Sequence, residues 1–310
     1  MRYIFVMIII CFIIVFLSKY ALENRSVVKN ASAGKIVCTT GMIASVVREI
    51  TGNSVDIVCL MGPGVDPHIY KAKPTDVIHI QEADLLLYNG LHLEGKMVEL
   101  FEELHKTKKV LPVSSLIDSS FFIQVDEGVY DPHLWHDVSL WKQIVMPLKE
   151  ELSILFSEHA AQFNENAVTY LKKLDDLHDS MKRKFFTIPV EKRILVTAHD
   201  AFGYFGRAYE FRVISLQGVS TDVQPGLADI TKLVDFIIEK KISVVFIESC
   251  IPKKSIEMVV HMAARRGHTV NIGKELLADA LGSREQNADF YIGMMRYNTQ
   301  VLMDGFAEYI

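Results

Sequence analysis

The segment Phe163–Phe185 is the feature that most constrains the fold of this 310-residue chain. It contains neither glycine nor proline, and its apolar residues recur every three or four positions, the spacing of one face of an α-helix. At 1.5 Å per residue, such a helix extends over roughly 35 Å, about the width of a small domain. Pro189 ends the helical pattern. The apolar face consists of Phe163, Ala167, Tyr170, Leu171, Leu174, Leu177, Met181 and Phe185.

Strand and helix patterns alternate on both sides of this helix. Before it, we predict strands at 35–40, 55–60, 85–88 and 110–113, with helices at 42–50, 74–82, 96–105 and from Trp141 to about Phe156. After it, we predict strands at 193–198, 211–216, 244–248 and 269–272, with helices at 227–240, from about Pro252, and at 288–309. This alternation indicates parallel sheets covered by helices.

The fold class we predict is therefore α/β, with two parallel-sheet lobes linked by one long rigid helix and a site between the lobes. The predicted segments are 1–33 (signal or anchor, with a spacer), 34–158 (N-terminal lobe), 159–187 (linking helix) and 188–310 (C-terminal lobe). The length suits two domains, since single cores rarely grow beyond about 250 residues. The alternative is a single domain carrying a long surface helix.

The charge of the chain argues against one class of partner. The formal net charge is −5, and the sequence contains no basic stripe. Proteins that bind nucleic acids need clustered Lys and Arg to contact phosphates, so we predict no nucleic-acid partner. We also predict a monomer.

The N-terminus reads as an export signal. Arg2 precedes an unbroken apolar run from Ile4 to Leu17, long enough for a signal-peptide core and short for a membrane span. A small-residue cleavage pattern occurs only later, at Ala31–Ala33. We therefore predict a periplasmic or other extracytoplasmic location, and the pattern leaves open whether the signal is cleaved or kept as an anchor.

Three cysteines follow this region, at positions 38, 59 and 250, and none forms a CxxC pair. A thiolate metal site is therefore unsupported. Cys38 and Cys59 fall near the ends of two predicted strands, so a disulfide is one alternative in an oxidising compartment. Three buried, inert thiols are the interpretation we favour.

Four polar residues are predicted at the carboxyl ends of strands or in the loops nearby, where open parallel sheets bind their ligands. His68 follows the second strand, and His133 precedes the long helices. His199 directly follows a strand of the second half, and Asp279 lies after the last strand. Three imidazoles and one carboxylate suit a divalent transition metal such as zinc, whose closed sites have four protein ligands. We predict these four as the metal ligands.

Each of these residues also has an ordinary structural explanation. A single histidine is more often a surface or hydrogen-bonded residue than a ligand, and Asp279 could cap a helix. His136 forms an HxxH pattern with His133. We predict that it lies behind the ligands or faces solvent. Glu248 ends a strand on the same side and is the best additional carboxylate.

Four motifs in this order carry a resemblance to a known family: MGPGVDPHIY, YDPHLWHDVSLW, LVTAHDAFGYFGRAYEF with LQGVST, and LLADALG. They resemble the TroA-type (cluster A-I) metal-binding receptors of bacterial ABC importers over nearly all of residues 35–310. The resemblance implies His68, His133, His199 and Asp279 as ligands of Zn²⁺ or Mn²⁺, and two lobes bridged by one long helix with limited closure. Two departures leave the metal open. Val113–Asp131 lacks the histidine-rich loop of many zinc receptors, and His199 stands where manganese receptors usually carry Glu.

The function we predict is that of an exported receptor, not an enzyme, which captures zinc or manganese and delivers it to the membrane permease of an ABC importer. Neither a GxSxG nor a GxxxxGK[ST] motif is present, and we predict no catalytic or cofactor-binding residue. One alternative is a metallohydrolase with His68, His133 and His199 on zinc, an open position for water, and Glu248 as base. A surface adhesin is another, without a sequence feature of its own.

Overall fold

The computed structural model describes residues 34–309, and Gly34–Ile310 form one compact unit. The predicted leader, with its apolar run and cleavage pattern, lies outside the described residues. Among the helices that are described, none is both long and apolar enough to cross a membrane.

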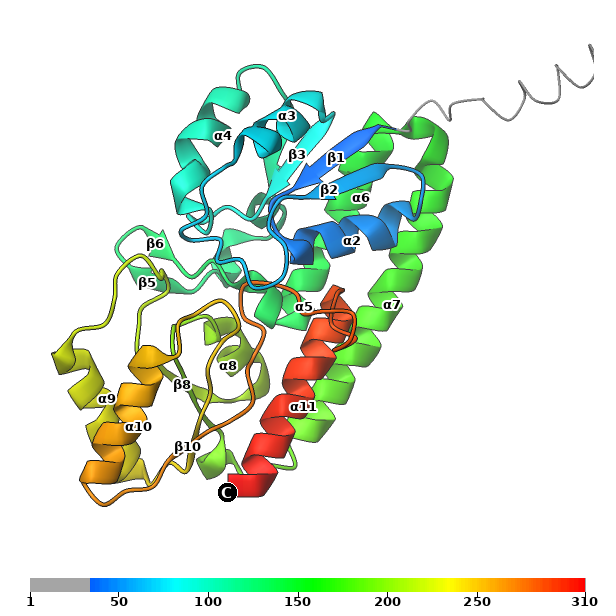
Figure 1. Ribbon diagram of the computed structural model, residues 1–310. Helices are drawn as coiled ribbons and strands as arrows, with labels where there is room; N and C mark the ends of the chain where they lie inside the picture. The colour runs from blue at the N-terminus through cyan, green and yellow to red at the C-terminus, as the bar shows by residue number, and fades with distance from the viewer. Residues whose placement is uncertain (1–33, 310) are drawn as a thin grey trace, which may run out of the picture. The chain divides into compact units, whose positions relative to one another are not determined.

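The first sheet has four parallel strands in the order β2-β1-β3-β4 (Figure 1). Alternate side chains of its central strand face opposite sides, as the pleat requires. Ile36 and Cys38 pack into a core on the side of the long helix, whereas Val37 packs with side chains of α3 and α4 on the other side. The strands are β1 (Lys35–Cys38), β2 (Asp56–Cys59), β3 (Leu85–Tyr88) and β4 (Val110–Pro112).

The helices around this sheet are α2 (Gly41–Thr51), α3 (Pro74–Glu82) and α4 (Val98–Leu104), the last preceded by a 3₁₀ turn at Gly95–Met97. Helix α2 ends where Gly52 takes a positive φ of 60° and donates its N–H to the Arg48 carbonyl. Helix α3 begins at Pro74, which needs no hydrogen bond for its missing N–H in the first turn. The sequence thus determines both helix boundaries locally.

The second half repeats the strand order of the first. Strand β7 pairs with β8 and β9 pairs with β10, all in parallel, and the Phe246 N–H donates to the Val196 carbonyl to join the two pairs. The resulting order β8-β7-β9-β10 matches β2-β1-β3-β4. The strands are β7 (Ile194–Thr197), β8 (Arg212–Ser215), β9 (Val244–Val245) and β10 (Asn271–Ile272), and the helices are α8 (Gly203–Tyr209), α9 (Leu227–Lys240), α10 (Lys254–Arg265) and α11 (Tyr291–Tyr309).

The segment between the first sheet and the long helix is less regular than predicted. The predicted helix from Trp141 to Phe156 is broken, because Pro147 lacks the N–H that a continuous helix would bond to residue 143. A hairpin and helix α8 were also not predicted. The elements here are 3₁₀ turns at Val113–Leu116, Ser119–Phe121, Leu134–His136, Lys142–Ile144 and Ser157–His159, strands β5 (Gln124–Asp126) and β6 (Val129–Tyr130), and helices α5 (Val138–Trp141) and α6 (Val145–Leu155). A last 3₁₀ turn, Val190–Lys192, precedes β7.

The long helix predicted from the sequence is α7 (Ala160–Phe185), with 26 residues. It contacts α2, α5 and α6 of the first half and α8 and α11 of the second, and in Figure 1 it runs alongside α11. The predicted apolar face is buried except for Leu171, which is partly buried. The helix therefore packs against both halves of the unit.

One hydrophobic core extends across both lobes. It includes Ile36 of β1 and Leu195 of β7, together with the buried face of α7 and part of α11. Two smaller cores lie on the outer faces of the sheets, one under α3 and α4 and one under α9 and α10. Because the central core is shared, a wide separation of the lobes would expose apolar surface to water at a high free-energy cost.

Leu174 tests the importance of this shared core. Its side chain is fully buried at the middle of α7, and Leu174→Ala is expected to lower the free energy of unfolding by about 3 kcal/mol, as for other buried leucines. Val168→Ala is the matched control, since Val168 is 56% exposed on the same helix, and it should change the value by less than about 0.5 kcal/mol. Denaturant unfolding measures both. Equal effects would contradict the packing described.

Candidate metal centre

The structure brings the four predicted ligand residues together. One donor atom from each of His68, His133, His199 and Asp279 lies within 4.8 Å of every other, and all four residues are buried. His68 comes from the β2–α3 loop and His133 from the turn before α5. His199 follows β7, and Asp279 lies in the loop between β10 and α11. Two residues from each lobe therefore converge at the carboxyl ends of the strands, as predicted.

The spacing of the donor atoms fits a tetrahedral ion. His68 Nε2 lies 3.3 Å from His133 Nε2, and Asp279 Oδ1 lies 3.4 Å from His133 Nε2. Asp279 Oδ2 lies 3.2 Å from His199 Nε2 and 3.7 Å from His68 Nε2. A zinc ion with ligands at about 2.0–2.1 Å places neighbouring donors roughly 3.3 Å apart. The four donors are therefore close enough together to bind one ion.

Carboxylates behind the histidines turn two imidazoles toward the centre. Asp131 Oδ1 lies 2.7 Å from His133 Nδ1, and Glu248 Oε1 lies 3.3 Å from His199 Nδ1. Hydrogen bonding at Nδ1 fixes the tautomer that leaves Nε2 free to bind an ion. Glu248 also accepts the backbone N–H groups of Ala198 and His199. Glu248 therefore supports a predicted ligand. Because its oxygens already accept these hydrogen bonds, they are poorly placed to take a proton from a water molecule as a general base would.

The loop carrying Asp279 is held from both lobes. The Trp135 indole N–H donates to the Ala278 carbonyl at 2.9 Å. On the other side, the Asn298 side chain of α11 forms two hydrogen bonds with the backbone of Leu277, at 2.9 and 2.7 Å. These hydrogen bonds fix the backbone next to Asp279 and thereby position its carboxylate.

At this site, burial and the neighbouring charges shift the pKa values of His199 and Asp279 in opposite directions. Burial alone would lower the pKa of His199, but the carboxylates of Asp279 and Glu248 raise it well above its usual value. Burial would likewise raise the pKa of Asp279, but the facing His199 and His133 hold it below its usual range. His68 differs, since burial lowers its pKa to about 3 despite the nearby Asp279. Without an ion, the raised pKa of His199 therefore favours a proton there that balances the buried carboxylate.

Two other sequence predictions have clear outcomes. His136 does not face solvent: it is fully buried, its ring lies 4.4 Å from that of Phe202, and it is not a member of the cluster. Cys38 and Cys59 lie opposite each other in β1 and β2, but all three described cysteines are free thiols. Cys250, predicted to be an inert thiol, lies next to the centre, with its Sγ 3.8 Å from Asp279 Oδ2, and burial raises its pKa well above the usual value.

The sequence did not predict the residues that hold the four ligands in place through hydrogen bonds. Asp66 and Asp131 each stand two positions before a predicted ligand in an Asp-Pro-His triplet, and in both triplets the carboxylate accepts the histidine N–H at 2.9 Å. The repeated triplet was the signal available. Trp135 and Asn298 gave no such signal, because only the folded chain brings them to the Asp279 loop.

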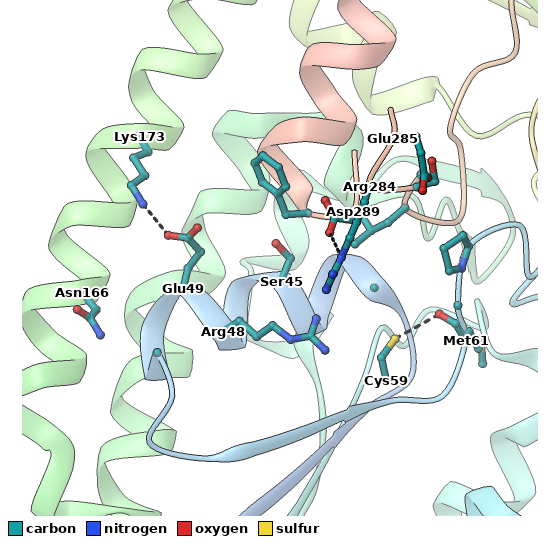
Figure 2. Close-up of a pocket in the computed structure, with 18 of the residues that line it drawn as sticks. Ser45, Arg48, Glu49, Cys59, Met61, Asn166, Lys173, Arg284, Glu285 and Asp289 are labelled. Carbon is teal, nitrogen blue, oxygen red and sulfur yellow. Dashed lines mark hydrogen bonds and ion pairs between the residues drawn. The ribbon is translucent and has the colours of Figure 1, made fainter. Parts of the chain in front are cut away.

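A separate open pocket of about 970 Å³ lies beside α2, α7 and the loop after Asp279 (Figure 2). None of the four clustered residues lines it. Its charged residues are balanced, and Lys173 pairs with Glu49 and Arg284 with Asp289. Because positive and negative groups neutralise each other there, the pocket has no evident preference for a charged ligand.

The fold and the buried cluster define a two-lobed α/β binding protein with a histidine-carboxylate centre. Residues 36–305 match the family described as "ZnuA: Zinc-uptake complex component A periplasmic". The chain belongs to this family of substrate-binding components of zinc and manganese ABC transporters.

Individual relatives agree on the family and differ in the metal they are named for. The zinc-binding protein TroA of Treponema pallidum is 43% identical, over 90% of this chain and 92% of its own length. The manganese-binding lipoprotein MntA of Bacillus subtilis is 41% identical, over 87% of this chain and 91% of its own length. The solved structure of periplasmic zinc-binding TroA from T. pallidum superposes with a TM-score of 0.86 at 42% identity, covering 88% of this chain and 99% of that one. The TroA-type resemblance and the predicted fold class are thereby confirmed.

Binding of a divalent ion is expected to release close to one proton at neutral pH, because the ion must displace the proton that the raised pKa keeps on His199. Affinity should then rise about tenfold per pH unit until the pH passes that pKa. His68, with a pKa of about 3, should add no competition in this range. Calorimetry in buffers of different ionisation enthalpy counts the protons.

Glu248→Gln provides the comparison for this prediction. The substitution keeps the shape of the side chain but removes one of the two carboxylate charges that raise the pKa of His199. Fewer protons should be released per ion in this variant at the same pH. Proton-free binding by the unaltered protein would contradict the charge assignment.

Proposed function

We propose that this protein captures one divalent transition metal ion, zinc or manganese, through His68, His133, His199 and Asp279, and delivers it to the permease of an ABC importer. The observation that carries the proposal is the convergence of four buried donors from two lobes, with one donor atom of each residue within 4.8 Å of every other. An ion enclosed in this way can be released only when some of its ligands move apart. That behaviour suits a carrier that must hold its cargo and later transfer it.

The geometry favours this function over the metallohydrolase alternative. Hydrolysis needs an open position on the metal for water and a free general base. Here Asp279 completes the set of donors, and Glu248 accepts hydrogen bonds from His199 and Ala198. We therefore propose a role without catalysis.

Zinc is the ion that the donor set should bind more tightly. Imidazole suits zinc, carboxylate oxygens suit manganese, and the intrinsic affinity of such sites generally rises from manganese to zinc. The relatives named for zinc and for manganese are almost equally similar to this chain, so the donor atoms are the basis for the expected zinc preference.

The proposal also includes the predicted export, location and oligomeric state of the protein. We propose that the protein is exported by its N-terminal signal to the periplasm or another extracytoplasmic space, cleaved or retained as an anchor, and acts there as a monomer. The division into segments 34–158, 159–187 and 188–310 stays a prediction.

Metal binding should raise the melting temperature of the protein. An ion that binds only the folded state stabilises it by about 4 kcal/mol at a thousandfold excess over its Kd. Micromolar zinc should therefore raise the melting temperature clearly, and manganese less so. His68→Ala should abolish most of the increase, since it removes one of the four donors.

His261→Ala is the matched control, because His261 is exposed on α10 and outside the cluster. It should respond to zinc as the unaltered protein does. A melting curve of the unaltered protein that neither metal shifts would refute the proposed function.

A further inference from the structure

The two Asp-Pro-His triplets share one turn but differ in their second contact. In both, the aspartate Oδ1 accepts the N–H of the histidine two positions on, at 2.9 Å. Asp131 uses the same oxygen to orient the His133 ring at 2.7 Å. Asp66 instead accepts a hydrogen bond from the Thr221 hydroxyl at 2.6 Å through its other oxygen, Oδ2. The first triplet is thus bonded to a distant part of the chain.

Thr221 belongs to the opposite lobe. It lies in the loop between β8 and α9, and its side chain is buried, with 6% exposed. The Asp66 carboxylate therefore joins the backbone of His68, a proposed ligand from the first lobe, to a loop of the second lobe. Hydrogen bonds to a charged group are among the stronger ones in proteins, and partial burial protects this one from competing water.

A second contact joins the 3₁₀ turn Gly95–Met97 of the first lobe to the same loop of the second lobe at the surface. Lys96 Nζ lies 2.9 Å from Asp222 Oδ2, and both side chains are more than a third exposed. Exposed ion pairs of this kind contribute little to stability. The buried Asp66–Thr221 bond is therefore the stronger of the two links.

The loop that carries His68 is exposed to solvent on both sides of the histidine. Pro63, Gly64 and Ile69 on either side of the histidine are exposed, whereas the His68 side chain itself is buried. An ion that leaves past this loop requires His68 to move away from Asp279. The Asp66–Thr221 bond resists that movement.

We propose that Asp66 and Thr221 form a latch that sets the rate at which the ion leaves. Asp66 acts as a positioning residue: it holds the backbone of His68 in place only while it is also bonded to the opposite lobe. Opening of the latch frees the His68 loop, and with it one of the four donors. This inference rests on the proposed function, because it requires an ion held by the four residues.

Thr221→Val is the direct test, since it replaces the hydroxyl with a methyl group and leaves the Asp66–His68 turn intact. Zinc-loaded protein is mixed with an excess of chelator, and the release rate is followed by stopped flow. Loss of a hydrogen bond to a charged group predicts roughly tenfold faster release. Thr221→Ser keeps the hydroxyl and should restore slow release, which a role in packing alone would not predict.

Two further variants complete the test. Thr231→Val is the matched control, because Thr231 is only partly buried on α9 and its hydroxyl donates to the Leu227 carbonyl of its own helix. It should release zinc at the rate of the unaltered protein. Asp66→Ala removes both bonds of the latch and should release zinc at least as fast as Thr221→Val, so it also serves as the test if Thr221→Val fails to fold.

The outcomes separate this inference from the proposed function. Unaltered protein that binds zinc, with Thr221→Val and Asp66→Ala releasing it at the same rate as Thr231→Val, would overturn the latch alone. Failure of the unaltered protein to bind zinc would overturn the proposed function. Fast release by Thr221→Val and Asp66→Ala, with slow release by Thr221→Ser, would establish the latch.

Discussion

The burial of one carboxylate among three imidazoles is the interaction on which this structure depends. Asp279 is almost fully buried, and an isolated charge in such surroundings would be strongly unfavourable. Against the effect of burial, Asp279 and Glu248 raise the pKa of His199, which favours a balancing positive charge on His199 when no ion is bound. A divalent cation replaces that proton and interacts with all four donors at once. The same arrangement therefore allows the empty protein to fold and favours the loaded one.

Hydrogen bonds between the lobes hold the loops that carry His68 and Asp279, which lets ligands from both lobes surround one ion. Trp135 of the first lobe holds the loop that carries Asp279 of the second, and the Asp66 carboxylate joins His68 to Thr221. The central core beneath them is continuous from β1 to β7 and along α7. Large separation of the lobes would break all of these contacts together, whereas a local movement of the His68 loop breaks few of them. The structure thus favours limited opening on one side of the centre.

Much of the fold could be predicted because its signals are local. The apolar face of α7, Gly52 after α2 and Pro74 at the start of α3 each act through a few neighbouring residues. Three of the four clustered residues follow predicted strands, and His133 lies in the loop before the long helices; ligand positions at the carboxyl ends of parallel strands can be predicted without tertiary detail. The break before α6 differs from the continuous helix predicted from the apolar pattern, because Pro147 lacks the N–H that a continuous helix needs there. The roles of Asn298 and Cys250 could not be predicted, since they depend on segments brought together only by folding.

The coordination of zinc in the loaded protein is the most direct test of the central claim. X-ray absorption at the zinc edge reports the number and type of the atoms that bind the ion. The account predicts four nitrogen or oxygen neighbours at about 2.0–2.1 Å, with the scattering pattern of three imidazoles and without sulfur. A sulfur neighbour from Cys250, or fewer than three imidazoles, would contradict it.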